Sequence, residues 1–407
     1  MMEGVEIMSI SIQTLDLDSS SIPGPHLPPS SEEFTVENNT CFVLNPSKDF
    51  SYERREIPQL RTPRHVRVRV IATGLCGSDI HYWQHGRIGR YTVDSPIILG
   101  HESSGIIEEC GIDVKELAVG DRVALEPGVG CSTCETCRHG QYNLCDSMQF
   151  AATPPYDGTL STFYCLPEEC CYKLPSHITL REGALVEPLG IAVHCCRLAG
   201  DLQGSAVAIF GAGPIGLLCC AVAQAFGATK VVIIDAVESR LNFAREFGAN
   251  EIYKMEFGSS ESNAEKLLAR TKLFGGADVV IDATGAESCI ACGVSALKRG
   301  GVFVQAGLGS PNIAFPIGQI CDKEATLKGS FRYGPGDYKL AIKLLDSNRV
   351  RLDSLITHDF TFSEAERAFG NVAKKQGIKS VIYGPGVDRA MAESSVEGGL
   401  AAAIPKL

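Results

Sequence analysis

The chain has 407 residues, of which 44% are hydrophobic, 21% are charged and 42 are glycine. This length exceeds one ordinary core, and the composition is that of a globular α/β protein, so we expect two domains. The formal net charge of -11 argues against nucleic acid and anionic membranes as partners, because both repel a surface of that sign.

The N-terminal end of the chain differs in composition from the rest. Residues 1–35 are rich in Ser and Pro without apolar periodicity, and we expect a flexible extension there. The first ten residues contain no Lys or Arg, which argues against a secretory signal and favours a cytoplasmic protein with reduced cysteines. No stretch approaches the roughly 20 apolar residues that a membrane helix needs.

Residues 36–187 are predicted to form a β-rich domain. Apolar and polar residues alternate in short runs such as 66–70 and 121–125, between Gly and Pro residues. This pattern is typical of half-buried strands in a sheet or barrel. The same texture returns after about residue 330 and ends in 378–383, so we expect residues 330–385 to complete this domain.

A possible metal site lies in this first domain. Cys76 follows Gly74-Leu75, and His101 and Glu102 follow Gly100. A thiolate, an imidazole and a carboxylate can hold a zinc ion while one position stays open for water or substrate, as catalysis requires. A lone Cys or His near a strand end is more often structural, so the spacing alone leaves both interpretations open.

A second cysteine pattern is more specific. Cys131, Cys134, Cys137 and Cys145 form Cys-x2-Cys-x2-Cys-x7-Cys in a glycine-rich stretch. Four thiolates from one irregular loop predict a closed tetrahedral zinc site that stabilises a lobe with few apolar residues. An iron–sulfur cluster is the alternative, but ferredoxin spacing closes with a shorter gap and a proline, whereas Asp146 follows here.

Residues 188–329 predict a doubly wound α/β domain. Nearly all-apolar runs at 206–210, 231–234, 278–281 and 302–304 are separated by helix-length segments, as in parallel strands covered on both faces. The sequence Gly211-Ala212-Gly213-Pro214-Ile215-Gly216 follows the first run directly. Glycines at this point let the backbone approach a pyrophosphate at a helix N-terminus, so Gly211, Gly213, Ile215 and Gly216 predict a dinucleotide site.

Asp235 predicts which dinucleotide binds. It ends the second apolar strand, nineteen residues after Gly216. A carboxylate there can accept hydrogen bonds from both ribose hydroxyls of NAD, and it repels the 2′-phosphate of NADP. Arg240 could instead hold a phosphate, or it could stack on the adenine or pair with Glu238. We expect NAD because Asp235 lies at the strand end.

The C-terminal residues add two expectations. Residues 386–407 are rich in Gly, Ala and Ser and predict a second flexible tail. The last three residues, Pro405-Lys406-Leu407, resemble the Ser-Lys-Leu peroxisomal address, which makes the peroxisome the alternative compartment.

Several ordered motifs together resemble one known family, the medium-chain zinc-dependent polyol dehydrogenases of the sorbitol and xylitol dehydrogenase type. The motifs are residues 74–82, 100–105, the four-cysteine loop, Glu187-Pro188-Leu189, 211–216 and 329–333. Residues 150–160 and 330–334 are most similar to the fungal xylitol dehydrogenases. The resemblance implies a GroES-like catalytic domain at 36–187, completed by 330–385, a Rossmann domain at 188–329, and usually a homotetramer. The complete four-cysteine set departs from animal sorbitol dehydrogenases, and the long tails have no counterpart.

The resemblance also implies roles for individual residues. Cys76, His101 and Glu102 would hold the catalytic zinc, and Glu187 beside them would bind it through a water or directly, so which glutamate is a ligand stays open. Ser78 and His81 would form a proton relay. The polyol would contact four residues: Tyr82, Glu187, Arg332 and Tyr333. The cofactor would contact Asp235 and Arg240 at the ribose and Ala306, Gly307 and Leu308 near the nicotinamide.

The expected function is therefore oxidation of a polyol to a ketose, with xylitol and D-xylulose as the implied pair. The cofactors are NAD and two zinc ions, one catalytic and one structural. L-Arabinitol and D-sorbitol remain alternative substrates. A reductase of the same superfamily without catalytic zinc and a non-catalytic NAD-binding sensor or structural protein are the alternatives of other classes.

Overall fold

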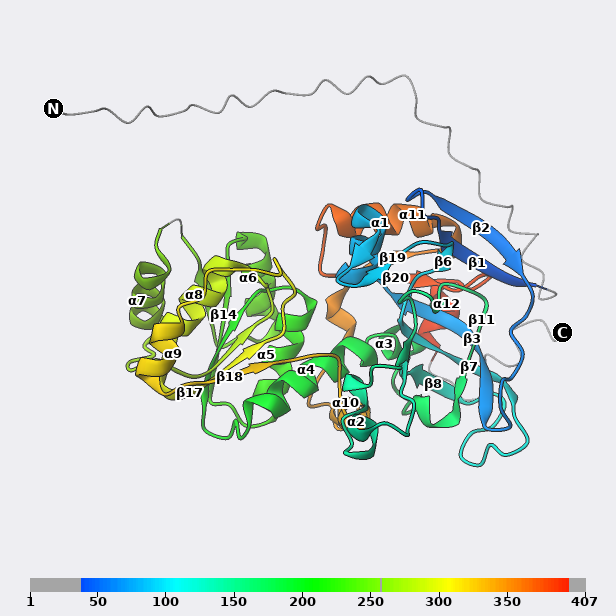
Figure 1. Cartoon of the computed structure of the whole chain (residues 1–407), viewed down its shortest axis with the longest axis horizontal. Coiled ribbons are helices and arrows are strands. Elements are labelled where there is room, and N and C mark those ends of the chain that lie inside the picture. Colours follow the sequence, from blue (N-terminus) through cyan, green and yellow to red (C-terminus); the bar gives the residue numbers. More distant parts are fainter. Residues whose placement is uncertain (1–37, 257, 395–407) are drawn as a thin grey trace, which may run out of the picture.

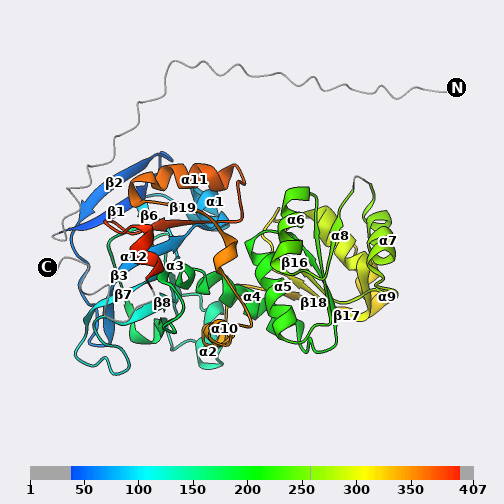
Figure 2. The same ribbon diagram turned by 180° about the vertical axis from the view of Figure 1, so that it is seen from behind.

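The computed structural model describes residues 38–256 and 258–394, which fold into two lobes that lie side by side (Figure 1). The first lobe is rich in strands and combines the N-terminal and C-terminal parts of the described chain, drawn in blue to green and in orange to red. The second lobe comes from the middle of the chain. Helices α4 (Val186–Ala199) and α10 (Asp337–Asp346) lie where the lobes meet in both views (Figures 1 and 2).

A seven-stranded sheet forms the centre of the first lobe. Its order is β12-β8-β7-β3-β20-β19, and β11 pairs with β3. Its strands are β3 (His65–Gly74), β7 (Glu102–Cys110), β8 (Arg122–Leu125), β11 (Phe163–Pro167), β12 (Cys171–Lys173), β19 (Ile356–Phe360) and β20 (Lys379–Tyr383).

Smaller sheets and short helices surround this sheet. The remaining strands are β1 (Asn39–Leu44), β2 (Phe50–Arg55), β4 (Arg87–Ile88), β5 (Tyr91–Thr92), β6 (Ile97–Ile98), β9 (Gly128–Val129) and β10 (Gln149–Phe150). The helices are α1 (Gly77–His85), α2 (Glu135–Arg138), α3 (Leu180–Gly183), α11 (Ala365–Ala373) and α12 (Arg389–Glu393). Short 3-10 turns lie at Tyr142–Leu144, Glu168–Cys170, Asp353–Leu355 and Phe362–Glu364.

The C-terminal strand β20 lies inside the large sheet. It pairs antiparallel with β3, where Ile382 is opposite Thr73, and parallel with β19. All five of its residues are buried, as expected for a strand covered on both faces. Residues 330–385, predicted to complete the first domain, thus supply two strands of its sheet. The domain limits at 187 and 329 stay predictions.

The second lobe has the Rossmann fold. Its six strands are parallel in the order β15-β14-β13-β16-β17-β18, which is the 3-2-1-4-5-6 order of that fold. The strands are β13 (Ala206–Phe210), β14 (Lys230–Asp235), β15 (Glu251–Lys254), β16 (Ala277–Asp282), β17 (Leu297–Gln305) and β18 (Thr326–Gly329). The helices are α5 (Pro214–Ala225), α6 (Glu238–Phe247), α7 (Ser260–Thr271), α8 (Glu287–Ala296) and α9 (Ile317–Lys323). The predicted fold class is confirmed.

Apolar side chains of this sheet divide between two cores. Val207 and Ile209 pack with α4, α5 and α6, which lie over the face seen in Figure 2, whereas Ala208 and Phe210 pack with α7 and α8. Successive residues of a strand point to opposite faces, so a strand buried on both faces must be apolar throughout. This explains the continuous apolar runs.

The region after Gly386 differs from the predicted flexible tail. Asp388 caps helix α12 by accepting a hydrogen bond from the N–H of Met391 (2.8 Å), and Ala392 is fully buried. An ion pair between Arg389 and Glu393 (2.7 Å) spans one turn of this helix. The rest of the predicted tail and the predicted extension at 1–35 lie outside the described residues.

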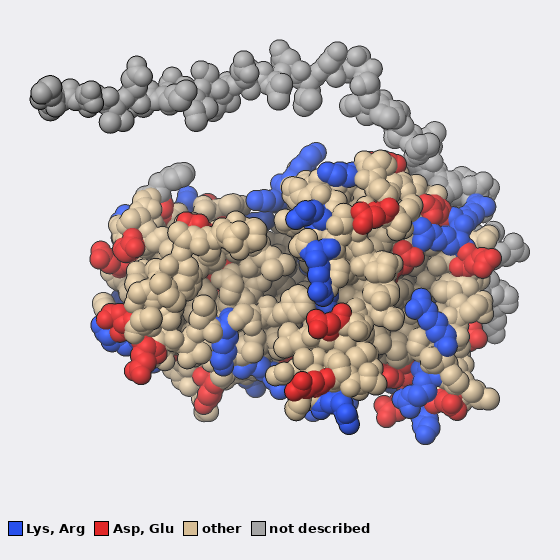
Figure 3. All heavy atoms as spheres, viewed as in Figure 1, with Lys and Arg blue, Asp and Glu red and all other residues tan. Residues whose placement is uncertain are grey.

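No helix in the described ranges is both long enough and apolar enough to cross a bilayer. Acidic and basic side chains are interspersed on the face shown in Figure 3. That face therefore carries no extended region of one sign.

Candidate active site

The first candidate site forms where β3 and β7 lie side by side. Gly74, at the end of β3, is opposite Glu102, at the start of β7. Cys76 comes two residues after β3 and precedes helix α1, so this pairing brings it close to His101 and Glu102. One ligand atom from each of the three side chains lies within 4.8 Å of the other two. This donor set fits one zinc ion.

Asp79 connects the two segments of this site. Its side chain is 1% exposed and accepts hydrogen bonds from the N–H groups of Cys76 (3.0 Å) and Gly100 (3.1 Å), and it lies 3.6 Å from Nδ1 of His101. Burial raises the pKa of Asp79, but His101 and the two N–H groups outweigh burial and keep that pKa below its ordinary value. A carboxylate behind an imidazole fixes the ring and leaves its other nitrogen for a metal.

Lys379, from β20, forms a buried ion pair with Glu102. Its Nζ donates to both carboxylate oxygens (2.8 and 2.7 Å) and to the carbonyl of Leu75 (3.1 Å), and the two side chains are 4% and 1% exposed. Gly74 leaves room for this arrangement, since a Cβ there would lie 2.3 Å from Oε2 of Glu102. Sequence analysis missed Lys379, which begins β20 and is followed by Ser380, so no local pattern marked it.

Glu187 faces the same site from the first turn of α4. The side chain is 2% exposed, and its Oε2 is buried without a hydrogen-bond partner. Burial, opposed by His101 and assisted by Glu102, raises the pKa of Glu187 to about 8. A buried oxygen of this kind is costly unless a ligand binds it. Because Lys379 holds both oxygens of Glu102, the choice between the two glutamates as zinc ligand stays open.

The predicted polyol contacts lie around this centre. Tyr82 and Tyr333 are 4% and 1% exposed, and the hydroxyl of Tyr333 is buried without a partner. Burial and the charge of Glu187 raise the pKa of Tyr333 well above its ordinary value. The guanidinium of Arg332 lies over the ring of Phe150, 4.0 Å from its centroid. That ring lies 5.9 Å from the His101 ring, so Arg332 lies close to the predicted zinc ligands.

The predicted proton relay lies on α1. Ser78 is half-buried and His81 is exposed, three residues further along the same helix face. The His81 ring also lies 5.3 Å from that of His85. Helix α1 therefore leads from Cys76 towards solvent.

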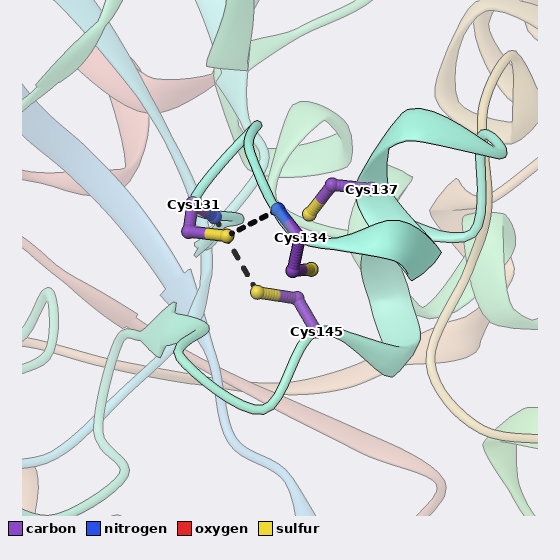
Figure 4. Close-up of side chains that lie close together, drawn as sticks. All are labelled: Cys131, Cys134, Cys137 and Cys145. Carbon is purple, nitrogen blue, oxygen red and sulfur yellow. Dashed lines mark hydrogen bonds between the residues drawn. The ribbon is translucent and has the colours of Figure 1, made fainter.

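The four-cysteine set forms a second metal-binding geometry. The sulfur atoms of Cys131, Cys134, Cys137 and Cys145 all lie within 4.8 Å of one another, and the side chains point into a common space (Figure 4). The N–H of Cys134 donates to Sγ of Cys131 (3.3 Å), and that of Cys131 donates to Sγ of Cys145 (3.4 Å). The Thr133 hydroxyl is the largest of the hydrogen-bond contributions that lower the pKa of Cys131 to about 5. Such a cage of thiolates fits a structural zinc.

The glycine turn after β13 has the form that a pyrophosphate requires. Gly211 has a φ of 105°, and Gly216 packs so closely that a Cβ would lie 1.8 Å from the Gly211 carbonyl oxygen. Gly213 precedes α5, and a Cβ there would meet no atom within 4 Å, so open space lies at the N-terminus of this helix. The N-terminus of a helix attracts phosphate groups. Pro214 and Ile215 begin the helix.

Asp235 ends β14 beside this turn. Its carboxylate accepts hydrogen bonds from the N–H groups of Ala212 (2.8 Å) and Val237 (2.8 Å), so it is fixed next to the glycines. Arg240 is half-buried in α6. The geometry therefore places an oriented carboxylate where the ribose of a dinucleotide binds in this fold.

Asp282, which sequence analysis missed, holds the loop that carries Ala306 and Gly307, the residues predicted to lie near the nicotinamide. It is fully buried and accepts hydrogen bonds from the Thr284 hydroxyl (2.6 Å), the Gly285 N–H (2.7 Å) and the Gln305 amide (2.7 Å). Its backbone carbonyl accepts from the N–H groups of Ala306 (2.9 Å) and Gly307 (2.8 Å). Asp282 follows an apolar strand just as Asp235 does, and this was the available signal. Leu308 is 76% exposed.

Two family models match the chain. Residues 62–176 match the alcohol dehydrogenase GroES-like domain, and residues 214–347 match the zinc-binding dehydrogenases. The second model supports the assignment of a Cys/His/Glu site and a four-cysteine site to zinc.

The chain is also similar to individual proteins over most of its length. The probable D-xylulose reductase A of Aspergillus clavatus is 53% identical over 350 residues, which is 86% of this chain and 98% of the relative. D-xylulose reductase A of Aspergillus niger is 49% identical over 354 residues, 87% of this chain and 99% of the relative. A putative zinc-binding dehydrogenase from Sinorhizobium meliloti, solved bound to NADP, is 28% identical with a TM-score of 0.78, covering 85% of this chain and 99% of that one.

Proposed function

Because this chain belongs to the zinc-binding alcohol dehydrogenases with a GroES-like domain, we propose that it interconverts xylitol and D-xylulose, with NAD as the hydride carrier. The observation that carries this proposal is the intact Cys76–His101–Glu102 centre in a chain similar to D-xylulose reductases over most of its length. The polar side chains of Arg332 and Tyr333, which are predicted to contact the substrate, support a polyol as the substrate.

The chain's own residues would hold both cofactors. When bound, zinc supplies a Lewis acid that acidifies an alcohol hydroxyl, and NAD supplies the hydride acceptor. Cys76, His101 and Glu102 would hold the zinc, Asp79 orients His101, and Glu187 offers its free oxygen to the metal or to a hydroxyl.

The proton released on oxidation needs a path out of a buried site. Ser78 is half-buried next to Cys76, and His81 is exposed on the same helix face. We propose that the Ser78 hydroxyl accepts this proton while it donates its own to the His81 imidazole, which releases a proton to solvent, because a hydroxyl and an imidazole can each accept and donate.

Polyols are favoured by two buried polar atoms without partners. Oε2 of Glu187 and the hydroxyl of Tyr333 lie inside the site, and a substrate with several hydroxyl groups can satisfy both. A simple alkanol leaves them unpaired, at a cost of about 1–3 kcal/mol for each group. Tyr82 and Arg332 would complete the contacts along the polyol chain.

The choice of NAD over NADP rests on Asp235. Its carboxylate is fixed by two backbone N–H groups and would repel a 2′-phosphate, whereas it accepts hydrogen bonds from ribose hydroxyls. Arg240 would stack on the adenine, and residues 306–308 would line the nicotinamide. A homotetramer and a cytoplasmic location stay predictions.

The test is a steady-state assay with NAD over xylitol, D-sorbitol, L-arabinitol, ribitol and ethanol. We expect the highest kcat/KM with xylitol, two zinc ions per chain by elemental analysis, and little turnover of ethanol. Cys76→Ser should abolish turnover while NADH binding, followed by fluorescence, persists. NADH binding without turnover of any alcohol by the wild type would indicate a sensor, and a higher kcat/KM for another polyol would reassign the substrate.

A further inference from the structure

The loop 330–334, between β18 and α10, presents both Arg332 and Tyr333 to the active site. Arg332 has a φ of 58°, in the left-handed region that side chains other than glycine rarely adopt. Such a conformation persists only where the surroundings hold it in place. The contacts that hold this loop therefore determine where its two polar side chains meet the substrate.

The four-cysteine lobe supplies one of these contacts directly. Asn143 lies in the 3-10 turn between Cys137 and Cys145, and its side chain is 7% exposed. Its Nδ2 donates a hydrogen bond to the carbonyl of Phe331 (3.0 Å), 188 residues further along the chain. This carbonyl belongs to the peptide bond that joins Phe331 to Arg332. Asn143 thus holds the backbone at the point where the left-handed turn begins.

Tyr142, next to Asn143, is connected to the same loop through a series of side-chain contacts. Tyr142 donates to Glu126, which also accepts from the hydroxyl of Tyr172 (2.7 Å). The Tyr172 ring stacks on Tyr338 with centroids 5.2 Å apart, and Tyr338 packs edge-on against Tyr333 at 4.9 Å. A continuous series of contacts therefore joins the cysteine lobe to the buried ring of Tyr333.

The side chain of Arg332 in this loop also packs on residues that follow Cys145. The guanidinium of Arg332 lies 4.0 Å from the centroid of Phe150 and contacts Met148. Phe150 belongs to β10, which pairs with β9 at the base of the lobe. Because a cation is attracted to the face of an aromatic ring, the Phe150 ring helps to hold the Arg332 guanidinium in place.

We propose that Asn143 is a positioning residue for the polyol: through its bond to the Phe331 carbonyl, the four-cysteine lobe sets the conformation of Arg332 and Tyr333. The inference rests on the proposed function. It gives this lobe a role in substrate recognition in addition to its fold. Because Arg332 and Tyr333 would contact the far hydroxyls both before and during hydride transfer, losing their placement should raise KM more than it lowers kcat.

The main variant is Asn143→Leu, which has the same branching and number of side-chain heavy atoms but no donor. We expect the KM for xylitol to rise about five- to tenfold, because one hydrogen bond contributes about 1 kcal/mol. We expect kcat, the KM for NAD and the zinc content to stay within about twofold of the wild type. The KM for 2-butanol, which has no far hydroxyls, should not change. Asn143→Gln keeps the amide and should restore part of the loss.

The matched control is Asn263→Leu in α7. The Asn263 side chain is 2% exposed; its Nδ2 donates to the backbone carbonyls of Glu256 (3.0 Å) and Ser259 (3.1 Å), and its Oδ1 accepts from the Glu256 N–H (2.9 Å). This variant removes buried hydrogen bonds between a side chain and the backbone in the other lobe, so it should lower the melting temperature and leave the KM for xylitol unchanged. A purely structural role for Asn143 predicts the same result for both variants.

Hydrogen exchange of the full chain gives a readout independent of activity. Asn143→Leu should speed amide exchange in residues 330–334, and Asn263→Leu should not. Unchanged exchange or an unchanged KM in Asn143→Leu overturns the inference. If the wild type oxidises no polyol, the proposed function fails while exchange still decides whether Asn143 holds the loop. Asn143→Ser, too short to reach the carbonyl, replaces Asn143→Leu if that variant does not fold.

Discussion

Lys379 and Glu102 form an ion pair within the most buried part of the active site. Both oxygens of Glu102 accept from the same ammonium group, and neither side chain is more than 4% exposed. Removing one member of such a pair leaves an uncompensated charge in a medium of low polarity, which costs more than the pair itself contributes. Lys379 is therefore a part of the metal centre, although it binds no metal.

We expect Lys379→Met to destabilise the metal-stripped protein by about 3 kcal/mol. The cause is the unpaired carboxylate of Glu102, so the double variant Glu102→Gln/Lys379→Met should regain part of the loss. Urea midpoints followed by circular dichroism measure both effects. A single variant as stable as the double variant would contradict this interpretation.

We propose that the choice of dinucleotide depends on Asp235. We expect Asp235→Ser to raise the ratio of kcat/KM for NADP to that for NAD by about a hundredfold, which corresponds to about 2.7 kcal/mol. The variant removes a charge that repels the 2′-phosphate and also loses a ribose contact. Steady-state kinetics with both cofactors measure the ratio.

The control for this experiment lies nearby. Glu238 is exposed and forms an ion pair with Lys254 (2.9 Å). Glu238→Ser removes an equal charge from the same region without touching the glycine turn, so the cofactor ratio should stay constant. Equal ratios in the two variants would show that general charge, and not the position of Asp235, sets the preference.

At the level of elements, Arg181 fixes the C-terminal segment to the first lobe. Its side chain, in α3, is 3% exposed and donates to both carboxylate oxygens of Asp359 in β19 (2.8 and 3.0 Å). Tyr383 of β20 donates to the same carboxylate (2.7 Å), and Arg389 at the start of α12 lies 3.3 Å from it. One carboxylate therefore joins two strands and two helices.

We expect Asp359→Asn to destabilise the protein by about 3 kcal/mol at neutral pH, because the buried Arg181 then loses the carboxylate that it contacts with two nitrogens and keeps only the exposed Asp353. Asp353→Asn is the matched control: Asp353 also contacts Arg181 (2.8 Å) but is 77% exposed, so its removal should cost less than about 1 kcal/mol. Urea midpoints measure both. Equal effects would contradict the role of Asp359.

The loss of stability in Asp359→Asn should depend on pH. Burial raises the pKa of Asp359, but hydrogen bonds from Arg181 and Tyr383 outweigh burial, so that pKa lies below its ordinary value of about 3.9. The stability from this group is therefore fully present above about pH 4 and is lost as the pH falls through the lower folded-state value. The difference between wild type and Asp359→Asn should shrink below pH 4, and a constant difference in urea midpoints would refute this.

At the scale of the whole molecule, local patterns predicted most of the fold. The continuous apolar strands and the glycine turn at 211–216 are contiguous in sequence, so the Rossmann lobe could be recognised from them. The first lobe was predicted only as a β-rich domain, because its sheet joins β3 to β20 across about 300 residues. Pairing over such a distance leaves no periodic signal in either strand.

The same contrast between local and long-range signals explains which active-site residues could be predicted from the sequence. Cys76, His101 and Glu102 could be proposed as metal ligands from their donor atoms, but their spacing left a structural role open, and the family resemblance carried the assignment. Two residues that support the metal ligands were missed: long-range pairing brings Lys379 there, and the role of Asp79 needs three-dimensional contacts. The proposed role of Asn143 also needs such contacts.

The position of β20 also leads to a prediction for shortened chains. A chain that ends at residue 376 lacks this strand and Lys379, which exposes the edge of β3 and leaves Glu102 unpaired. We expect it to aggregate or to lack a folded first lobe. Soluble expression and near-ultraviolet circular dichroism test this, with a chain that ends at residue 394 as the control. A soluble short form that still binds two zinc ions would contradict it.

That insertion of a late strand has a consequence for synthesis. A ribosome releases the strands of the Rossmann lobe one after another, so that half can fold while translation continues. The first lobe must wait for β20, which is made about 300 residues after β3. Interrupted translation before β20 would therefore yield a protein with a folded Rossmann lobe but without a finished metal centre.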